Sequence, residues 1–518
     1  GQNSDLFDAY CKLEASDEFS SLSEAQQKVI TQAIRDFKLS GVALDDEKKA
    51  RYAEVKSRLS DLGSTFSNNV MDGTFGWQKH ITDQAELAGL PESALGAAKQ
   101  LAESKELEGW LFTLDIPSYL PIMTHADNSQ LREEMYRAYT SRASDQGPNA
   151  GKWDNTEIIE ETLGLRQELA KLLGFKHFAE YSLASKMANS GEQVNGFLQD
   201  LAKRSKPQAQ QDIDTLTAFA KEHYQADKLQ AWDYSYYSEK LKEQTYKISD
   251  EQLRPYFPEN KVVKGLFEVV SRLYNLTISV RDDIDTWHKD VCFYDIHDQT
   301  GELRGSFYLD LYAREKKRGG AWMDECQVRR QKVDGSQQYP VAYLTCNFNG
   351  PVGDKPALFT HDEVVTLFHE FGHGLHHMLT KINVGGVSGI NGVAWDAVEL
   401  PSQFLENWCW QPEALSFISG HFETGEALPQ NLLDNMLAAR NFQSAMQMLR
   451  QLEFSLFDFS LHENFVAGQT NVQQWLDKVR QEVAVLIPPS FNRFQNSFGH
   501  IFAGGYAAGY YSYKWAEV

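Results

Sequence analysis

A chain of 518 residues is longer than a single hydrophobic core usually serves, so we expect two or more lobes. Its net charge of −22 at pH 7 disfavours nucleic acid and anionic membrane surfaces as partners, because both repel an acidic protein. Five scattered cysteines without C-x-x-C spacing predict no disulfide framework and favour the cytoplasm, and no apolar run is long enough to span a bilayer.

The first part of the chain is predicted to be helical. Within residues 52–66, apolar residues recur at 3-4-3-4 spacing, which is the pattern of a long helix packed on its neighbours. Residues 128–144 form a second amphipathic pattern, and glycines and a proline at 147–151 break it. We therefore predict a domain boundary at this break, with an N-terminal helical lobe at 1–150 and a larger region at 151–518.

Short aromatic and apolar runs predict a small sheet in the middle of the chain. Residues 290–296 and 306–312 flank the turn sequence Asp-Gln-Thr-Gly-Glu at 298–302, which predicts a hairpin. Residues 340–348 are predicted to form a third strand. Helical patterns return from His361 onward.

The sequence His-Glu-Phe-Gly-His at residues 369–373 matches H-E-x-x-H and lies inside a strongly helical stretch. Thr360 and Glu363 fit a capping box that starts this helix. Histidines four residues apart stand on one helix face, where both imidazoles can bind one Zn²⁺. Glu370 lies between them and can act as general base on a water that the metal activates. On these five residues alone, two histidines that only pack on a helix surface are the alternative.

A catalytic Zn²⁺ needs three protein ligands and an open position for water. After His369 and His373, the best candidate is Glu399, at the expected start of a second helix, although a lone glutamate is more often exposed to solvent. His376 is a further turn along and is assigned to packing or to support of a ligand. Glu406, seven residues after Glu399, is a candidate to support a ligand histidine.

Residues 498–513 combine four glycines in eleven residues with three regularly spaced tyrosines. The glycines predict a pliant loop. Tyr506, Tyr510 and Tyr513 follow i, i+4, i+7 spacing, which predicts one helical edge carrying three phenols. Such a stripe is more often core or interface. Beside a zinc hydrolase motif, however, phenols or a histidine on a closing loop can stabilise the oxyanion of peptide hydrolysis.

The segments 369–377, 398–408 and 498–513 together resemble the M3 zinc metallopeptidases, the thimet oligopeptidase-like family. The similarity runs through nearly the whole chain, with the three motifs in the correct order. The resemblance implies a mostly α, zincin-type fold of two helical lobes, with a deep substrate channel and a small antiparallel sheet near the active site. It also implies one Zn²⁺ per chain and a cytoplasmic monomer that acts on short peptides.

The resemblance also assigns the site residues. It implies zinc ligands at His369, His373 and Glu399, with Glu370 as the catalytic carboxylate, inside a catalytic region at 151–518. The positions that match the family in the Gly-rich segment are His500, Tyr510 and Tyr513 for catalysis, and Gly504, Gly505 and Tyr506 for substrate binding.

We therefore expect a zinc metalloendopeptidase that hydrolyses internal bonds of short unstructured peptides. The peptide backbone is expected to add as a strand to the small sheet beside residues 341–348. A peptidyl-dipeptidase of the same family is the alternative, and a non-enzymatic helical scaffold with a chance H-E-x-x-H is a remote one. The chain opens at Gly1 without Met and ends without a helix stop, and we expect a fragment of a longer protein, truncated at both ends.

Overall fold

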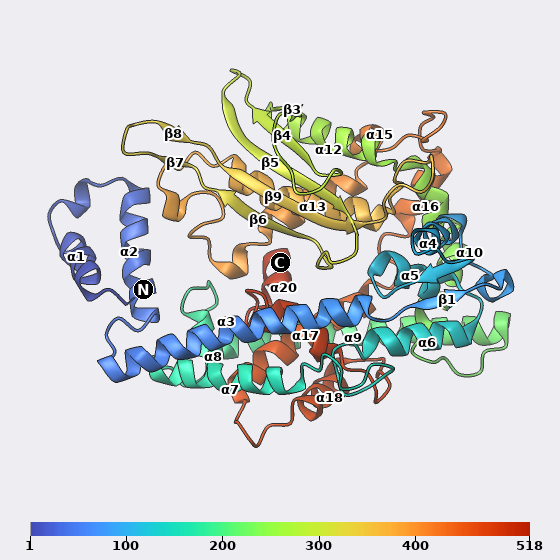
Figure 1. Ribbon diagram of the computed structural model, residues 1–518, viewed down its shortest axis with the longest axis horizontal. Helices are drawn as coiled ribbons and strands as arrows, with labels where there is room; N and C mark the ends of the chain where they lie inside the picture. Colours follow the sequence, from blue (N-terminus) through green and yellow to red (C-terminus); the bar gives the residue numbers. More distant parts are fainter. Residues whose placement is uncertain (1) are drawn as a thin grey trace.

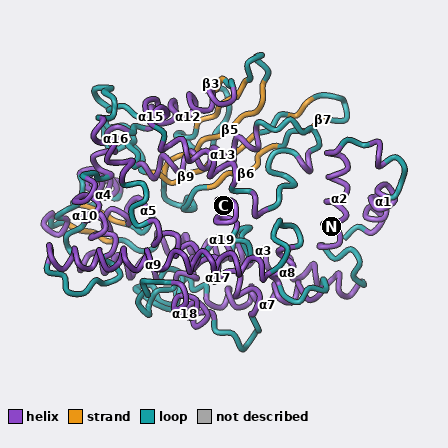
Figure 2. The backbone as a smooth tube through the Cα atoms, turned by 180° about the vertical axis from the view of Figure 1, so that it is seen from behind, coloured by secondary structure: helices purple, strands orange, loops and turns teal. Residues whose placement is uncertain are grey.

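The computed structural model describes residues 2–518; Gly1, where we expect a cut end, lies outside the described residues. The chain is mostly helical, as predicted, and its elements gather into two bodies that face each other across the centre of the molecule (Figure 1). The upper body in Figure 1 carries the main sheet, and the lower body is helical. The last helix, α20 (Ser512–Glu517), lies between the two bodies in both views (Figures 1 and 2).

Long helices pack side by side in the lower body (Figure 2). The predicted helix at 52–66 is confirmed as the middle of α3, where Tyr52, Val55 and Phe66 are buried. The core beneath it also takes in side chains from the far end of the sequence, such as Phe457 and Tyr511. The helices of this body are α3 (Asp46–Phe75), α7 (Thr156–Leu172), α8 (Phe178–Leu183), α9 (Gly191–Tyr224), α17 (Ser444–Asn464), α18 (Val472–Val483) and α19 (Gly499–Phe502).

The upper body is built on a five-stranded sheet with the order β3-β4-β5-β9-β6. The predicted hairpin is confirmed, because β4 and β5 pair antiparallel, and the predicted third strand is β9. The strands are β3 (Thr277–Arg281), β4 (Cys292–His297), β5 (Leu303–Tyr312), β6 (Trp322–Gln327) and β9 (Val341–Phe348).

Two expectations about this sheet are wrong. The sheet is mixed rather than antiparallel, because β5 and β9 run parallel, with Ser306 opposite Val341. The strand expected to receive a peptide, residues 341–348, is hydrogen-bonded on both sides, by β5 and by β6. The free edges belong to β3 and β6, and the short pair β7 (Arg330–Gln331) and β8 (Gln337–Gln338) extends from the β6 side.

Helices α12 (Glu259–Tyr274) and α13 (His361–Met378) pack against the sheet and close the upper core. Apolar side chains from both helices and from β5 and β9 meet there, among them Leu266, Phe307 and Phe371. Nearby lie α14 (Leu400–Glu406), α15 (Pro412–Ile418) and α16 (Gln430–Ala438).

The remaining elements flank the two bodies (Figure 1). On one side are α1 (Ser4–Glu14) and α2 (Glu24–Leu39); on the other are β1 (Lys79–Ile81), α4 (Glu92–Ser104), β2 (Trp110–Phe112), α5 (Ile116–His125), α6 (Ser129–Thr140), α10 (Tyr234–Tyr246) and α11 (Asp250–Leu253). The amphipathic pattern at 128–144 is confirmed as α6, whereas the domain boundary near residue 150 stays a prediction. Across residues 2–518, no helix combines the length and apolarity needed to cross a membrane.

Candidate metal centre

Helix α13 begins as the sequence predicts. Thr360 Oγ1 accepts the Glu363 backbone N–H at 3.1 Å, and the Glu363 carboxylate accepts the Thr360 N–H at 3.0 Å. This capping box fixes the first turn, so the H-E-x-x-H residues fall in the middle of the helix. On either side of His369 and Glu370, Phe368 and Phe371 are fully buried in the upper core. The motif is therefore held on one side by packing into the upper core.

Three potential metal ligands converge at this point. Glu399 Oε2 lies 3.2 Å from His369 Nε2 and 3.1 Å from His373 Nε2. Among residues 2–518, these three form the one group of three or more His, Cys, Asp or Glu residues whose ligand atoms all lie within 4.8 Å of one another. The Glu399 side chain is 1% exposed, while the two imidazoles retain 18% and 12% exposure. A carboxylate this deeply buried requires a cationic partner.

The donor set fits a catalytic zinc site. An ion about 2.0–2.1 Å from each ligand in tetrahedral geometry spaces its ligand atoms about 3.3 Å apart, close to the separations found here. Glu406 Oε1 lies 2.6 Å from His369 Nδ1, which fixes the ring so that Nε2 faces the other ligands. A carboxylate behind a ligand histidine is the usual support for a zinc site. Glu406 therefore lies behind His369, the kind of position predicted for it from the sequence.

Glu399 reaches α13 because the two helices touch at a glycine. Glu399 is the N-cap of α14, and Pro401 lies in the first turn of that helix, as predicted. A Cβ added to Gly372 would stand 2.6 Å from both the Pro401 carbonyl oxygen and the Ser402 Cα. Only glycine permits this approach. Ser402 Oγ also donates to Glu399 Oε2 at 3.0 Å and steadies the carboxylate.

Burial and pairing set the protonation of the cluster. Burial alone lowers the pKa of His369, but its hydrogen bonds to Glu399 and Glu406 outweigh this effect and raise the pKa to about 10. Burial raises the pKa of Glu399, yet the two histidines more than offset it and hold the pKa well below its usual range. Burial also raises the pKa of Glu370, against the opposing pull of His369 and His373. Glu370 is thus a better proton acceptor than a solvated glutamate.

The other histidines of α13 lie outside this cluster. His376 is half-buried, its Nδ1 has no hydrogen-bond partner among the described residues, and it is not one of the three convergent ligands. His377 is buried and its Nε2 lies 2.9 Å from the Gln327 carbonyl oxygen at the end of β6. His377 therefore ties the helix to the sheet edge.

The tyrosines of residues 498–513 gather beside the cluster, but not on one helix edge as predicted. Residues 503–511 form turns between α19 and α20, because the glycines interrupt the helical spacing. The rings nevertheless meet: Tyr506 stacks on Tyr513 with centroids 5.1 Å apart, and Tyr510 lies 5.0 Å from Tyr513. The Tyr506 hydroxyl donates to Glu399 Oε1. The loop therefore brings phenols against the carboxylate ligand without a continuous helix.

His500 completes this aromatic cluster. Its ring centroid lies 5.4 Å from Tyr510, 5.6 Å from Tyr506 and 6.2 Å from Tyr513. Burial lowers the pKa of His500 below its usual range, so the imidazole is neutral at neutral pH. Gly504 and Gly505 are exposed, and the Tyr510 hydroxyl donates to Gln451 Oε1 of α17 at 3.0 Å.

Two buried aspartates near the site were missed by sequence reasoning. Asp396 lies three residues before Glu399 and accepts the Tyr511 hydroxyl at 2.8 Å and the Met187 N–H at 2.8 Å. Asp458 lies on α17 and accepts backbone N–H groups of the Gly-rich segment. Asp396 lies just before the segment 398–408 that we singled out, whereas nothing near Asp458 in the sequence marks it.

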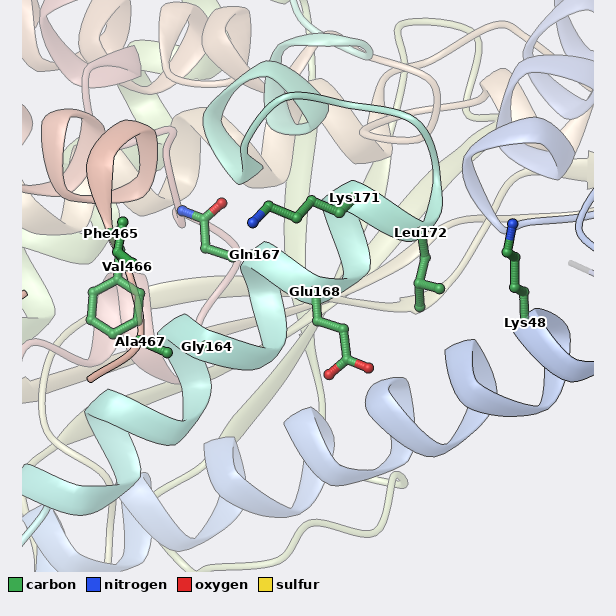
Figure 3. Close-up of a pocket in the computed structure, with 9 residues that line it drawn as sticks. All are labelled: Lys48, Gly164, Gln167, Glu168, Lys171, Leu172, Phe465, Val466 and Ala467. Carbon is green, nitrogen blue, oxygen red and sulfur yellow. The ribbon is translucent and has the colours of Figure 1, made fainter. Parts of the chain in front are cut away.

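Two surface pockets help to delimit the candidate site. One, of about 560 Å³, lies between α3, α7 and residues 465–467 and contains none of the predicted site residues (Figure 3). The other, of about 570 Å³, is lined by α3 and by Phe502, Ala503 and Gly504, together with Arg166 and Arg318. Of the two, only the second is lined by the Gly-rich segment, and neither is lined by His369, His373 or Glu399.

Comparison with known proteins agrees with this geometry. Residues 122–518 match Peptidase family M3, and residues 1–49 match the Neurolysin/Thimet oligopeptidase N-terminal domain. Oligopeptidase A of Escherichia coli (strain K12) is 64% identical over 100% of this chain and 76% of its own length. The probable cytosolic oligopeptidase A of Arabidopsis thaliana is 46% identical over 100% of this chain and 75% of its own length.

A more distant relative and a solved structure extend the comparison. The dipeptidyl carboxypeptidase of Escherichia coli (strain K12) is 31% identical over 93% of this chain and 70% of its own length. The solved structure of PZ peptidase A with inhibitor 2 superposes with a TM-score of 0.57 at 14% identity, covering 99% of this chain and 72% of that one, which supports the fold alone. The matched family and the identity to oligopeptidase A together show that the chain belongs to peptidase family M3.

Proposed function

We propose that this peptidase is a zinc-dependent oligopeptidase that hydrolyses internal bonds of short, unstructured peptides. The observation that carries the proposal is the convergence of His369, His373 and Glu399 beside Glu370, with ligand atoms spaced for one tetrahedral ion. One Zn²⁺ per chain would be held by the two Nε2 atoms and the Glu399 carboxylate. When bound, Zn²⁺ supplies polarisation of the scissile carbonyl and activation of the attacking water.

Glu370 is the proposed general base. Its carboxylate lies one residue beyond His369 on the same helix and is nine-tenths buried or more, which keeps its proton affinity high. Glu370 accepts the proton of the attacking water and then returns it to the nitrogen of the leaving amine. His369 and His373 stay in place during this transfer, since Glu406 and the packing of α13 hold them.

Tyr510, Tyr513 and His500 are the proposed partners of the oxyanion and of the substrate. Burial raises the pKa of both phenols, so each keeps its proton and can donate it as a hydrogen bond. The Tyr510 hydroxyl has to turn from Gln451 toward the substrate to do so. Neutral His500 can donate one ring N–H to a peptide carbonyl, and Tyr506, Gly504 and Gly505 are proposed to contact the peptide backbone.

The peptide is proposed to pair with β6 instead of β9. Strand β6 has a free edge, its residues Asp324–Gln327 are exposed, and His377 ties its end to α13. Main-chain pairing reads backbone rather than side chains, which predicts broad sequence specificity. A peptide with a methylated backbone nitrogen at one position that pairs with β6 should bind more weakly than its parent.

A second candidate is removal of dipeptides from C-termini, favoured by the 31% identity to a dipeptidyl carboxypeptidase. Mass spectrometry of the products of a decapeptide blocked at both ends separates the two reactions. Internal cuts in the blocked decapeptide support the oligopeptidase. Release of dipeptides only from the same decapeptide with a free C-terminus supports the peptidyl-dipeptidase. A cytoplasmic location and a monomeric state remain parts of the proposal.

The test of the mechanism is Glu370→Gln in the metal-loaded protein. We expect loss of peptide hydrolysis by several orders of magnitude with one zinc per chain retained, because no ligand atom changes. Metal content is measured by atomic emission and hydrolysis with a quenched fluorescent peptide. Substantial hydrolysis by this variant at full zinc occupancy would remove Glu370 from the role of base.

A further inference from the structure

The backbone of the Gly-rich segment at residues 498–513 is hydrogen-bonded to a single buried carboxylate, that of Asp458. Asp458 Oδ1 accepts the Ala508 N–H at 2.8 Å, and Oδ2 accepts the N–H groups of Gly509 at 2.9 Å and Tyr510 at 3.0 Å. Asp458 is 0% exposed. Ala508 has a positive φ of 49°, which turns successive amides toward one centre and makes an anion-binding concavity. The carboxylate therefore fixes three consecutive peptide units of the segment that carries the phenols.

A chain of buried polar groups holds Asp458 in turn. His462, one turn along α17, donates its Nδ1–H to the Asp458 backbone carbonyl oxygen at 2.7 Å, and the same nitrogen lies 3.1 Å from Asp458 Oδ1. Its Nε2 lies 3.0 Å from a guanidinium nitrogen of Arg166. Because Arg166 can only donate, Nε2 accepts and Nδ1 carries the proton toward Asp458. Lys186 lies close enough to act electrostatically on both Asp458 and Asp396. The Asp458 carboxylate thus lies against the His462 ring, and Arg166 and Lys186 place positive charge near it.

Helix α17 holds Tyr510 at both ends. Asp458 binds the Tyr510 backbone N–H, and Gln451, two turns earlier on the same helix, accepts the Tyr510 hydroxyl. The neighbouring residue is fixed as well, because Tyr511 donates to Asp396. By contrast, Gly504 and Gly505, earlier in the same loop, are exposed. The segment therefore divides into a clamped half at 507–511 and a glycine half at 503–505.

We propose that Asp458 is a positioning residue for catalysis, which holds the backbone of residues 508–510 so that the Tyr510 phenol is preorganised for the oxyanion. The inference rests on the oxyanion role proposed above for Tyr510. A donor whose backbone is already held in place needs little rearrangement at the moment of reaction, and here only the Tyr510 hydroxyl has to turn from Gln451 to the substrate. A displacement of about 1 Å in such a donor costs roughly 10²-fold in rate.

Asp458→Asn tests the clamp with little change in side-chain volume. The amide keeps one acceptor oxygen but presents an NH₂ group to amides that donate, so the loop has to shift. We expect kcat to fall roughly 10²-fold, KM to change less than about twofold and zinc content to stay at one per chain. The matched control is Glu453→Gln on the same helix, a buried carboxylate that contacts Arg480 and not the loop. The control should leave kcat within about twofold, whatever it does to thermal stability.

Combination with Tyr510→Phe separates positioning from general destabilisation. If Asp458 acts through Tyr510, Asp458→Asn in the Tyr510→Phe background lowers kcat no further. If kcat of the double variant falls by the product of the two single-variant losses, the inference is overturned. If Tyr510→Phe alone leaves kcat unchanged while Asp458→Asn lowers it, the oxyanion role and this inference both fail, but the metal site and Glu370 stand.

A milder variant keeps the inference testable if Asp458→Asn does not fold. His462→Leu removes the imidazole that lies against the Asp458 carboxylate, with its contact of 3.1 Å between Nδ1 and Oδ1, and leaves the three amide bonds in place. We expect the same pattern at smaller size, with a lower kcat, an unchanged KM and no added effect in the Tyr510→Phe background. Loss of kcat in His462→Leu that persists in full in that background contradicts the proposal.

Discussion

The contact between Glu406 and His369 gives the sharpest prediction about metal binding. Glu406 Oε1 lies 2.6 Å from His369 Nδ1, and the His369 ring in turn presents Nε2 to Glu399. Removing the negative charge of Glu406 lowers the basicity of the imidazole and releases its orientation. Zinc binding should therefore weaken although no ligand atom is altered.

The size of the effect follows from what each substitution leaves behind. Loss of such a supporting carboxylate typically costs 10- to 100-fold in metal affinity, or about 1.4 to 2.7 kcal/mol. Glu406→Gln keeps a carbonyl oxygen that can still accept the Nδ1 proton, so we expect about tenfold. Glu406→Ala keeps neither charge nor acceptor, and we expect about 100-fold.

Competition against a zinc-binding dye measures the apparent dissociation constant of each variant. Glu413→Gln is the control, because Glu413 is an exposed glutamate of α15 outside the site. A zinc affinity that falls from the parent to Glu406→Gln, and again to Glu406→Ala, supports the reasoning. Equal affinity for all three would mean that Glu406 has no part in orienting His369, and the site would then depend on the packing of α13 alone.

Three further predictions concern the phenols, the helix contact and the sheet. Tyr513→Phe should lower kcat roughly 10²-fold at unchanged zinc content, and an unchanged kcat removes Tyr513 from the reaction. Gly372→Ala should weaken zinc binding at least about tenfold by pushing α14 away, whereas Gly374→Ala, whose Cβ meets only flexible side-chain ends, should not. Burial raises the pKa of Asp310, but hydrogen bonds from Arg314, Lys317 and a tryptophan outweigh it and lower the pKa from 3.8 to about 2. Ionised Asp310 thus stabilises the fold above pH 4 by about 2 kcal/mol; urea unfolding of Asp310→Asn should show this loss at pH 7, and the difference should shrink as pH falls from about 4 toward 2.

Local sequence signals predicted the elements that local physics decides. The capping box at Thr360 and the apolar spacing of α13 are interactions within one helix, so the H-E-x-x-H residues could be placed before any tertiary contact was known. The hairpin of β4 and β5 is likewise set by its own turn. Local signals do not identify Glu399 as a metal ligand, because a lone glutamate is usually exposed. The family resemblance assigned that role to it.

The failures came where distant segments decide the outcome. The sequence shows β9 as a strand but not that β6 pairs with its outer side, since that pairing depends on how a long connection folds back. The tyrosine spacing predicts a helix, but the glycines interrupt it, and Asp458 and Asp396, which are distant in sequence, bind the loop in its turns. A buried aspartate that accepts backbone amides has no local pattern to reveal it.

The metal ligands and the phenols stand on different hydrophobic cores. Helix α13 packs into the upper core through Phe368 and Phe371, whereas Tyr510 and Tyr511 belong to the lower core. Three hydrogen bonds between the two cores end near α14: Tyr506 to Glu399, Tyr511 to Asp396, and Gln403 to the Tyr513 carbonyl. Each of these bonds joins the stretch that supplies the third ligand to the segment that supplies the phenols. Motion of one body relative to the other would therefore act on Glu399 and on the proposed oxyanion donors together, so that the geometry of the proposed ligand and the placement of the proposed donors would change as one.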